Sequence, residues 1–200
     1  MPTLQDLISR VRLRIKEKDI QYFKNTDIID LANGQYEFFY QYLQSYDCLF
    51  VVNFQKETLS SSNLDITLSD FNGCIAPLVR ISLAELIPKY DPLSGIFSWQ
   101  ETATGIKFYN ANDYYGSDVS IGYWSKIPSI TSDAALTSDI PWPEWFSALY
   151  RAVIVEAQEI REHDNSRMAI FAEAAFTNIT AKIIQNHGTV NYNMRYNLGV

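Results

Sequence analysis

The spacing of apolar residues changes twice along this 200-residue chain, and this change limits the possible folds more than any other feature. Before Tyr46, and again from Pro143 to Gly188, apolar residues recur every three or four positions, which is the period of an α-helix. Between Leu49 and Ser125 they alternate with polar residues, as in β-strands. We therefore expect helices at both ends of the chain and strands in the middle.

Four helices are predicted. The first runs from Thr3 to Asp19, with Thr3 and Asp6 spaced as a helix cap, and the second runs from Thr26 to Tyr46. Asn33-Gly34 is typical of a hairpin turn, but the helical period continues across it, which favours a helix. Two further helices begin at Pro143 and after Asp164, the last ending at Gly188. Their expected buried stripes are Phe146, Leu149, Tyr150, Val153, Ala157 and Ile160, and Met168, Ala172, Ala175, Phe176, Ile179 and Ile183, with Phe176 facing the third helix.

The middle of the chain predicts five or six short strands. The segments 49–59 and 64–71 are separated by a Ser/Asn cluster and predict a hairpin. Other strands are expected over 76–84, 95–100, 105–110 and 118–125. The predicted fold is α+β and mainly α: a small antiparallel helical bundle, made of two N-terminal and two C-terminal helices, with a β-rich insertion and an extended C-terminal tail. The corresponding ranges are 1–48, 49–140, 141–188 and 189–200.

Composition and charge exclude several classes of protein. With 47% hydrophobic residues the chain should fold, and with a net charge of −7 it lacks the overall basic character of proteins that wrap DNA. Its first residues do not resemble a signal peptide and no apolar run would span a membrane, so we expect a soluble protein. Eleven acidic and five basic residues lie between Asp47 and Asp139, whereas Arg10, Arg12 and Arg14 make the first helix basic.

Few residues suggest chemistry. Glu159 and His163 could ligate a metal from one helix face, but the other helices offer no matching ligand pattern, and His163 and His187 are interpreted as surface residues near helix ends. Cys48 and Cys74 have apolar neighbours and are interpreted as small buried side chains. Because nucleophile and phosphate-loop motifs are missing as well, we expect no enzyme, no cofactor and no metal.

Several segments resemble one family. NTDIIDLANGQYEFF follows a basic amphipathic helix; later, VSIGYWSKIP is followed by the linker SITSDAALTSDIP and by PEWFSALYRAVIVEAQEI. This order is similar to that of the head-to-tail adaptor (connector, or neck) proteins of tailed bacteriophages, over about Thr3–Tyr46 and Gly95–Gly188. The match over 49–91 extends only to β-rich character.

The resemblance implies a structural subunit of the virion neck, made in the host cytoplasm. Such subunits form rings, usually dodecameric, between the portal protein and a tail or nozzle protein; DNA passes through the ring without specific binding, and no membrane is involved. Expected contacts to the portal or a neighbouring subunit come from the basic flank of the first helix and from the tail, whose apolar residues alternate as in an added strand. These residues are Arg10, Arg12, Arg14, Tyr192, Met194, Arg195, Tyr196 and Leu198.

Two alternatives stay open. The acidic residues could keep a DNA channel repulsive, or they could merely keep the protein in solution. The aromatic residues of the β-rich segment could form a carbohydrate- or peptide-binding platform, or they could fill a small core. Those aromatic residues are Trp99, Tyr109, Tyr114, Tyr115, Tyr123 and Trp124.

Overall fold

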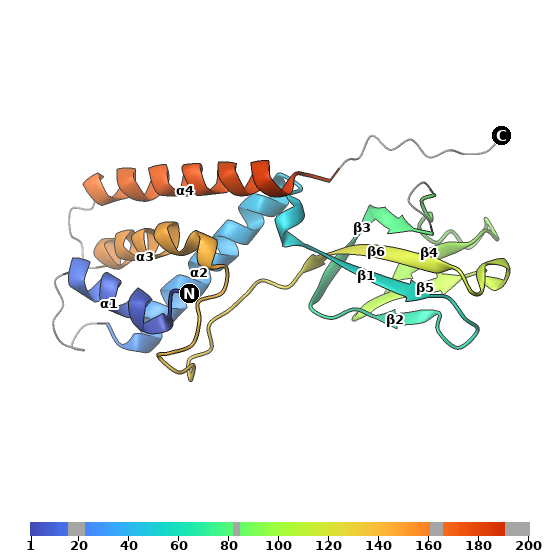
Figure 1. Cartoon of the computed structure of the whole chain (residues 1–200), viewed down its shortest axis with the longest axis horizontal. Coiled ribbons are helices and arrows are strands. Elements are labelled where there is room, and N and C mark those ends of the chain that lie inside the picture. Colours follow the sequence, from blue (N-terminus) through green and yellow to red (C-terminus); the bar gives the residue numbers. More distant parts are fainter. Residues whose placement is uncertain (16–22, 82–84, 161–165, 191–200) are drawn as a thin grey trace. The chain divides into compact units, whose positions relative to one another are not determined.

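A computed structural model describes residues 1–15, 23–81, 85–160 and 166–190 (Figure 1). The chain divides into two compact units. The helical unit comprises Met1–Tyr46 and Ile127–Gly188, and the β unit comprises Asp47–Lys126 together with the chain from Thr189. No helix in the described ranges has the length and apolar character needed to cross a lipid bilayer.

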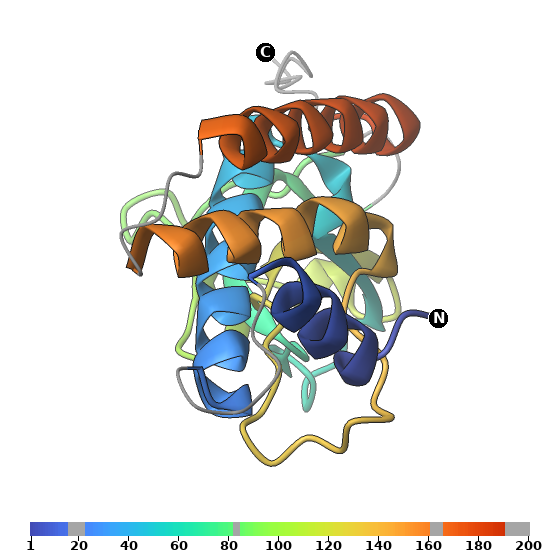
Figure 2. The same ribbon diagram turned by 90° about the vertical axis from the view of Figure 1, so that its left-hand side faces the viewer.

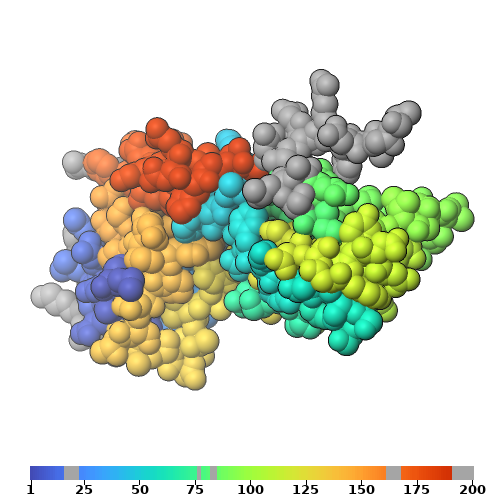
Figure 3. All heavy atoms as spheres, turned by 45° about the vertical axis from the view of Figure 1, so that its right-hand side comes forward, coloured from blue at the N-terminus to red at the C-terminus, as the bar shows by residue number. Residues whose placement is uncertain are grey.

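The helical unit contains four α-helices among its described residues: α1 (Leu4–Arg14), α2 (Asn25–Ser45), α3 (Phe146–Ile160) and α4 (Ser166–His187). A short 3₁₀ turn, Pro143–Trp145, leads into α3. Helix α3 contacts each of the other three helices. It runs alongside α4, and α2 crosses both (Figure 2), so the four helices are not the simple antiparallel bundle that the periodicity suggested. The neighbouring α3 (orange) and α4 (red) also appear together on the surface in Figure 3.

Local sequence explains the start of α1. The Thr3 N–H donates to Asp6 Oδ2 at 2.8 Å and the Asp6 N–H donates to Thr3 Oγ1 at 3.3 Å, which confirms the predicted cap. Leu4, Leu7, Ile8 and Val11 are buried on one face. Helix α1 ends at Arg14 with Ile15 as its C-cap, and residues 16–19 of the predicted helix lie outside the described residues.

Helix α2 runs through Asn33-Gly34, as the apolar period predicted. The Asn33 side chain is occupied elsewhere: its Nδ2 donates to the Ile130 carbonyl at 2.9 Å, and its Oδ1 accepts from the Ile130 N–H at 2.8 Å. Asn33 therefore stabilises the connection before α3 instead of forming a turn. At the other end of the unit, Gly188 adopts φ +75° and its N–H donates to the Ile184 carbonyl at 2.8 Å, which confirms it as the cap of α4.

An aromatic cluster joins α2 to α4. The Phe176 ring lies 4.8 Å from that of Tyr42, 5.2 Å from that of Phe39 and 5.4 Å from that of Phe38, all on α2. Trp145, which is fully buried, stacks 4.1 Å from Phe39. The Phe176 ring also lies 6.0 Å from that of Trp145, within the predicted third helix, so the expected contact is present. The additional packing on α2 was not predicted, because helical spacing identifies the buried face but not the helices that cover it.

The β unit contains six strands in its described residues, arranged as two three-stranded antiparallel sheets. The first has the order β1–β6–β3 and the second β2–β5–β4. Their bounds are β1 (Val52–Thr58), β2 (Asp65–Thr67), β3 (Phe71–Arg80), β4 (Ser98–Glu101), β5 (Gly105–Tyr109) and β6 (Asp118–Ser125). The predicted hairpin of segments 49–59 and 64–71 is absent from this described unit: β1 pairs with β6, from Val52 opposite Trp124 to Thr58 opposite Asp118, and β2 pairs with β5.

The β unit has a hydrophobic core of its own, built around the fully buried Trp99. Its other large members are Leu59, Ile66, Leu68, Val79, Ile87, Ile106, Phe108, Val119, Ile121 and Tyr123. Gly105 is required where β5 meets β2, because a Cβ there would collide with the Ile66 carbonyl oxygen.

The predicted fold class was therefore wrong. The segment expected to be an insertion in a mainly α bundle forms two sheets around a separate core, and so it is a second compact unit. The predicted tail also begins too early: the Val190 N–H donates to the Asp47 carbonyl at 2.8 Å, and its side chain is buried with Val52, Ile75 and Leu78. Residues 191–200 lie outside the described part of the chain.

Candidate partner-binding pocket

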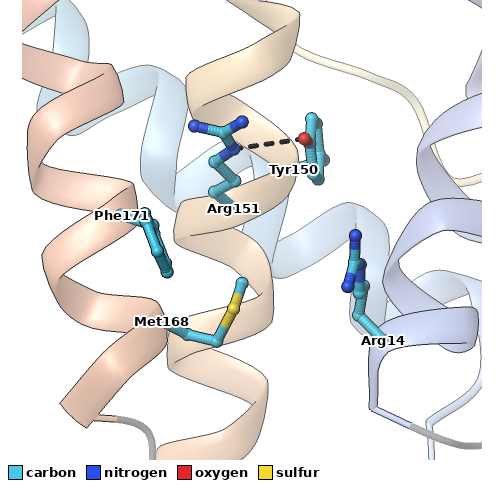
Figure 4. A pocket seen from close by; sticks show the side chains of 5 residues that line it. All are labelled: Arg14, Tyr150, Arg151, Met168 and Phe171. Atoms are coloured by element: carbon cyan, nitrogen blue, oxygen red, sulfur yellow. Dashed lines mark hydrogen bonds between the residues drawn. The ribbon is translucent and has the colours of Figure 1, made fainter.

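A pocket of about 490 Å³ opens in the helical unit where α1, α3 and α4 meet. Arg14 comes from the last turn of α1, Tyr150 and Arg151 from α3, and Met168 and Phe171 from the first turns of α4 (Figure 4). Arg14 lies across the pocket from Met168 and Phe171. The volume falls in the range of roughly 300–1,000 Å³ that is typical of ligand pockets.

Tyr150 organises the cationic wall of the pocket. Its hydroxyl accepts a hydrogen bond from Arg151 Nε at 3.1 Å, and the Arg151 guanidinium carbon lies 5.6 Å from the Tyr150 ring centroid. The Arg10 guanidinium carbon lies 5.3 Å from the same ring and 5.1 Å from the ring of Phe146. These cation–π contacts hold arginine side chains in place at a modest entropic cost.

The pocket joins two kinds of surface. Two guanidinium groups line it, and no carboxylate is among the described residues that line it. The opposite wall is apolar, and the Phe171 side chain is 49% exposed. Guanidinium groups pair in bidentate fashion with carboxylates, and Met and Phe side chains bury apolar groups. The arrangement suits an acidic group that is carried next to an apolar one.

The three arginines predicted to contact partners lie in different surroundings. Arg14 lines the pocket, and Arg10 packs on the aromatic rings beside it. Arg12 Nη2 instead donates to the Phe23 carbonyl at 2.8 Å and to Asn25 Oδ1 at 3.0 Å, which ties α1 to the start of α2. Arg12 therefore stabilises the helical unit itself.

Sequence reasoning missed most of the pocket. Tyr150 and Met168 were assigned to buried helix stripes, and Arg151 and Phe171 were given no role. The signal available was the adjacent pair Tyr150-Arg151 in an otherwise apolar turn of α3, but nothing in the sequence indicates that α1 and α4 converge on it. The tail residues Tyr192, Met194, Arg195, Tyr196 and Leu198 lie outside the described residues.

The aromatic residues of the suggested binding platform are largely used for packing. Trp99 is fully buried and its Nε1 donates to the Ile87 carbonyl at 2.8 Å, and Tyr123 is 2% exposed. Tyr109 stacks on Tyr90 with ring centroids 4.2 Å apart, and Tyr114 stacks on Phe97 at 4.3 Å.

The cysteines and histidines considered for catalysis or metal binding form no such site among the described residues. Both cysteines are free thiols. Burial raises the pKa of Cys48, and burial together with the nearby Glu101 raises the pKa of Cys74 to about 12. No group of three or more His, Cys, Asp or Glu side chains in the described ranges could hold a metal ion, and His163 lies outside those ranges.

Comparison of the chain with models of known protein families and with curated proteins found no match.

Proposed function

We propose that this chain is a structural ring subunit of a bacteriophage neck, which joins the portal to the tail and surrounds the DNA channel. The observation that carries the proposal is that the helical parts of the two resembling segments fold together. Residues 1–46 and 127–188, which include α1, α2, α3 and α4, form one compact unit although about eighty residues of β structure separate them. The resemblance thus covers both parts of this helical unit and, over Gly95–Lys126, extends into the β unit.

The order of elements at the second segment adds support. Strand β6 ends after the aromatic pair Tyr123-Trp124, a connection rich in Ser, Thr and Asp follows, and Pro143 opens the 3₁₀ turn before α3. This order of elements is the one in which the chain resembles the adaptor proteins.

The distribution of exposed apolar residues also fits a subunit with several neighbours. On the helical unit the exposed side chains include Leu13, Phe38, Ile170 and Phe171; on the β unit they include Phe54, Leu93 and Ile96. Single exposed apolar residues are ordinary, but a ring subunit needs contact surfaces on more than one side. The β unit carries nine acidic and five basic residues from Asp47 to Lys126, a charge that would not retain passing DNA.

The direct test is assembly. The purified protein, alone and with a portal protein from the same genome, would be examined by native mass spectrometry and negative-stain microscopy. We expect closed rings of one subunit number, or incorporation into the portal ring. A protein that stays monomeric in both samples and shows a sugar-dependent change in Trp fluorescence would support the binding-module alternative and contradict the proposal.

The tail offers a second test. The test is a truncated variant that lacks residues 191–200. Thr189 and Val190 are kept because they belong to the β unit. We expect the melting temperature to stay within a few degrees while assembly with the portal is lost. A matched control keeps the length of the tail and replaces Tyr192, Met194, Tyr196 and Leu198 with serine; it should also fail to assemble. If both variants are incorporated normally, the tail does not contribute to the interface with the portal.

A further inference from the structure

The β3–β4 connection carries the most exposed large apolar side chain of the described residues. Leu93 is 93% exposed and Ile96, three residues on, is 53% exposed. Both belong to the turn Asp91–Ile96, here named the 91–96 turn. An apolar side chain that is fully in water gains nothing in the free subunit, so burial of this turn against another surface would be favourable.

The 91–96 turn is held in one shape. Asp91 Oδ1 accepts from the Leu93 N–H at 3.0 Å, and the Asp91 carbonyl accepts from the Ser94 N–H at 3.2 Å and from Ser94 Oγ at 2.9 Å. At its base the Tyr90 N–H donates to the Trp99 carbonyl at 2.7 Å. A turn that is already ordered loses little conformational entropy on binding.

The chemistry of this turn complements that of the pocket in the helical unit. Leu93 and Ile96 match the apolar wall of Met168 and Phe171, and the Asp91 carboxylate matches the guanidinium groups of Arg14 and Arg151. The neighbouring cation, Lys89, has its ammonium 5.2 Å from the Trp99 ring centroid, so its charge is directed to that ring. A carboxylate has several acceptor positions, so the bond to Leu93 leaves Asp91 able to accept from an arginine.

We propose that the 91–96 turn of one copy inserts into the Arg14–Arg151 pocket of a second copy. The inserted turn buries Leu93 against Met168 and Phe171 and pairs Asp91 with the arginines. This inference rests on the proposed function in that both require contact between copies, and it names the contact.

The proposed contact joins two different surfaces of the chain. The turn and the pocket are different surfaces on different units, so one copy can donate its turn to one neighbour and accept the turn of another, which is a heterologous contact. Such contacts continue from copy to copy, and they close into a ring where the rotation between neighbouring copies permits it.

Cysteine crosslinking tests the contact. Leu93→Cys and Met168→Cys are made separately and together, and treated with a short bismaleimide; the native Cys48 is buried and the Cys74 thiol has its pKa raised to about 12, so both react slowly. Mixing the two single variants should give covalent dimers and no larger species, whereas the double variant should give a ladder. Ser62→Cys, on another exposed turn of the β unit, replaces Leu93→Cys in the control and should give no dimers with Met168→Cys.

Three results would overturn the inference. Closed rings without crosslinked dimers would refute this contact while leaving the proposed function intact. A double variant that crosslinks only within single chains would show that the turn fills the pocket of its own copy. A protein that stays monomeric would contradict both the inference and the proposed function.

Charge-reversal variants test the proposed ion pair independently of crosslinking. Asp91→Arg or Arg151→Asp should each raise the concentration needed for half-assembly at least about tenfold, and their combination should recover part of the loss. Lys182→Glu, an exposed charge reversal elsewhere on α4, should leave assembly unchanged. Unaltered melting curves would show that each variant is folded. Equal assembly of all the variants would contradict the proposed ion pair between Asp91 and the arginines.

Discussion

Replacement of Gly34 with alanine should stabilise the helical unit by about 1 kcal/mol, because glycine in a helix interior costs about that much relative to alanine. Gly34 is exposed in the middle of α2, and an alanine Cβ there would have no heavy atom of another part of the chain within 4 Å. The substitution therefore neither collides nor buries new surface, and helix propensity alone sets its size. For a unit of about 100 residues the expected rise in melting temperature is roughly 4–8 °C.

Gly188→Ala is the matched control. Its Cβ would likewise have no heavy atom within 4 Å, but Gly188 has φ +75°, a conformation that costs a non-glycine residue about 1–2 kcal/mol. The same added methyl group should therefore lower the melting temperature. Both variants and the original chain would be compared by far-UV circular dichroism at one protein concentration, since assembly shifts apparent stability. A Gly34→Ala variant that melts at or below the original temperature would refute the reasoning.

Three other outcomes are expected. Asn33→Ala should cost about 1–3 kcal/mol in urea unfolding, because the Ile130 N–H and carbonyl lose their partner; an unchanged midpoint would show that water replaces the amide. The Thr3 N–H lowers the pKa of Asp6, so the charged cap stabilises the fold above the unfolded pKa near 4 and this contribution disappears as the pH falls through the folded value; Asp6→Asn should melt earlier than the original near neutral pH and equally at strongly acidic pH. Iodoacetamide should modify Cys74 on the order of a thousandfold more slowly in the native protein than in urea, because the raised pKa leaves little thiolate; comparable rates would place this thiol in solvent.

Features that depend on a few neighbouring residues were predictable from the sequence. The Thr3–Asp6 cap and the Gly188 terminus each require residues of one turn only, and the structure has both. The helix through Asn33-Gly34 could be predicted because the apolar period on either side outweighs one unfavourable residue. The bounds of β6 also match the alternating run Asp118–Ser125.

Strand partners were not predictable in the same way. Alternation of apolar and polar residues shows that a segment has a buried and an exposed face. It does not show which other strand the segment pairs with, because every alternating segment has two such faces. The pairing of β1 with β6 joins residues 60 to 72 positions apart, and the adjacent segments expected to form a hairpin belong to different sheets. The same limit hid the second core, and so the fold was taken for a bundle with an insertion.

The sequence by itself determined the approximate positions of the helices and of most strands in the described residues, because these follow from the spacing of residues within one element; β3, at Phe71–Arg80, begins before the strand predicted over 76–84. The tertiary structure decided that α1, α3 and α4 meet around Arg14, Arg151 and Met168 and leave a pocket there. It also decided that Trp99 is a core residue of the β unit and not part of an exposed platform. Both depend on packing between distant segments, whose free energy is set by the fit of whole surfaces and is not written in the period of any one of them.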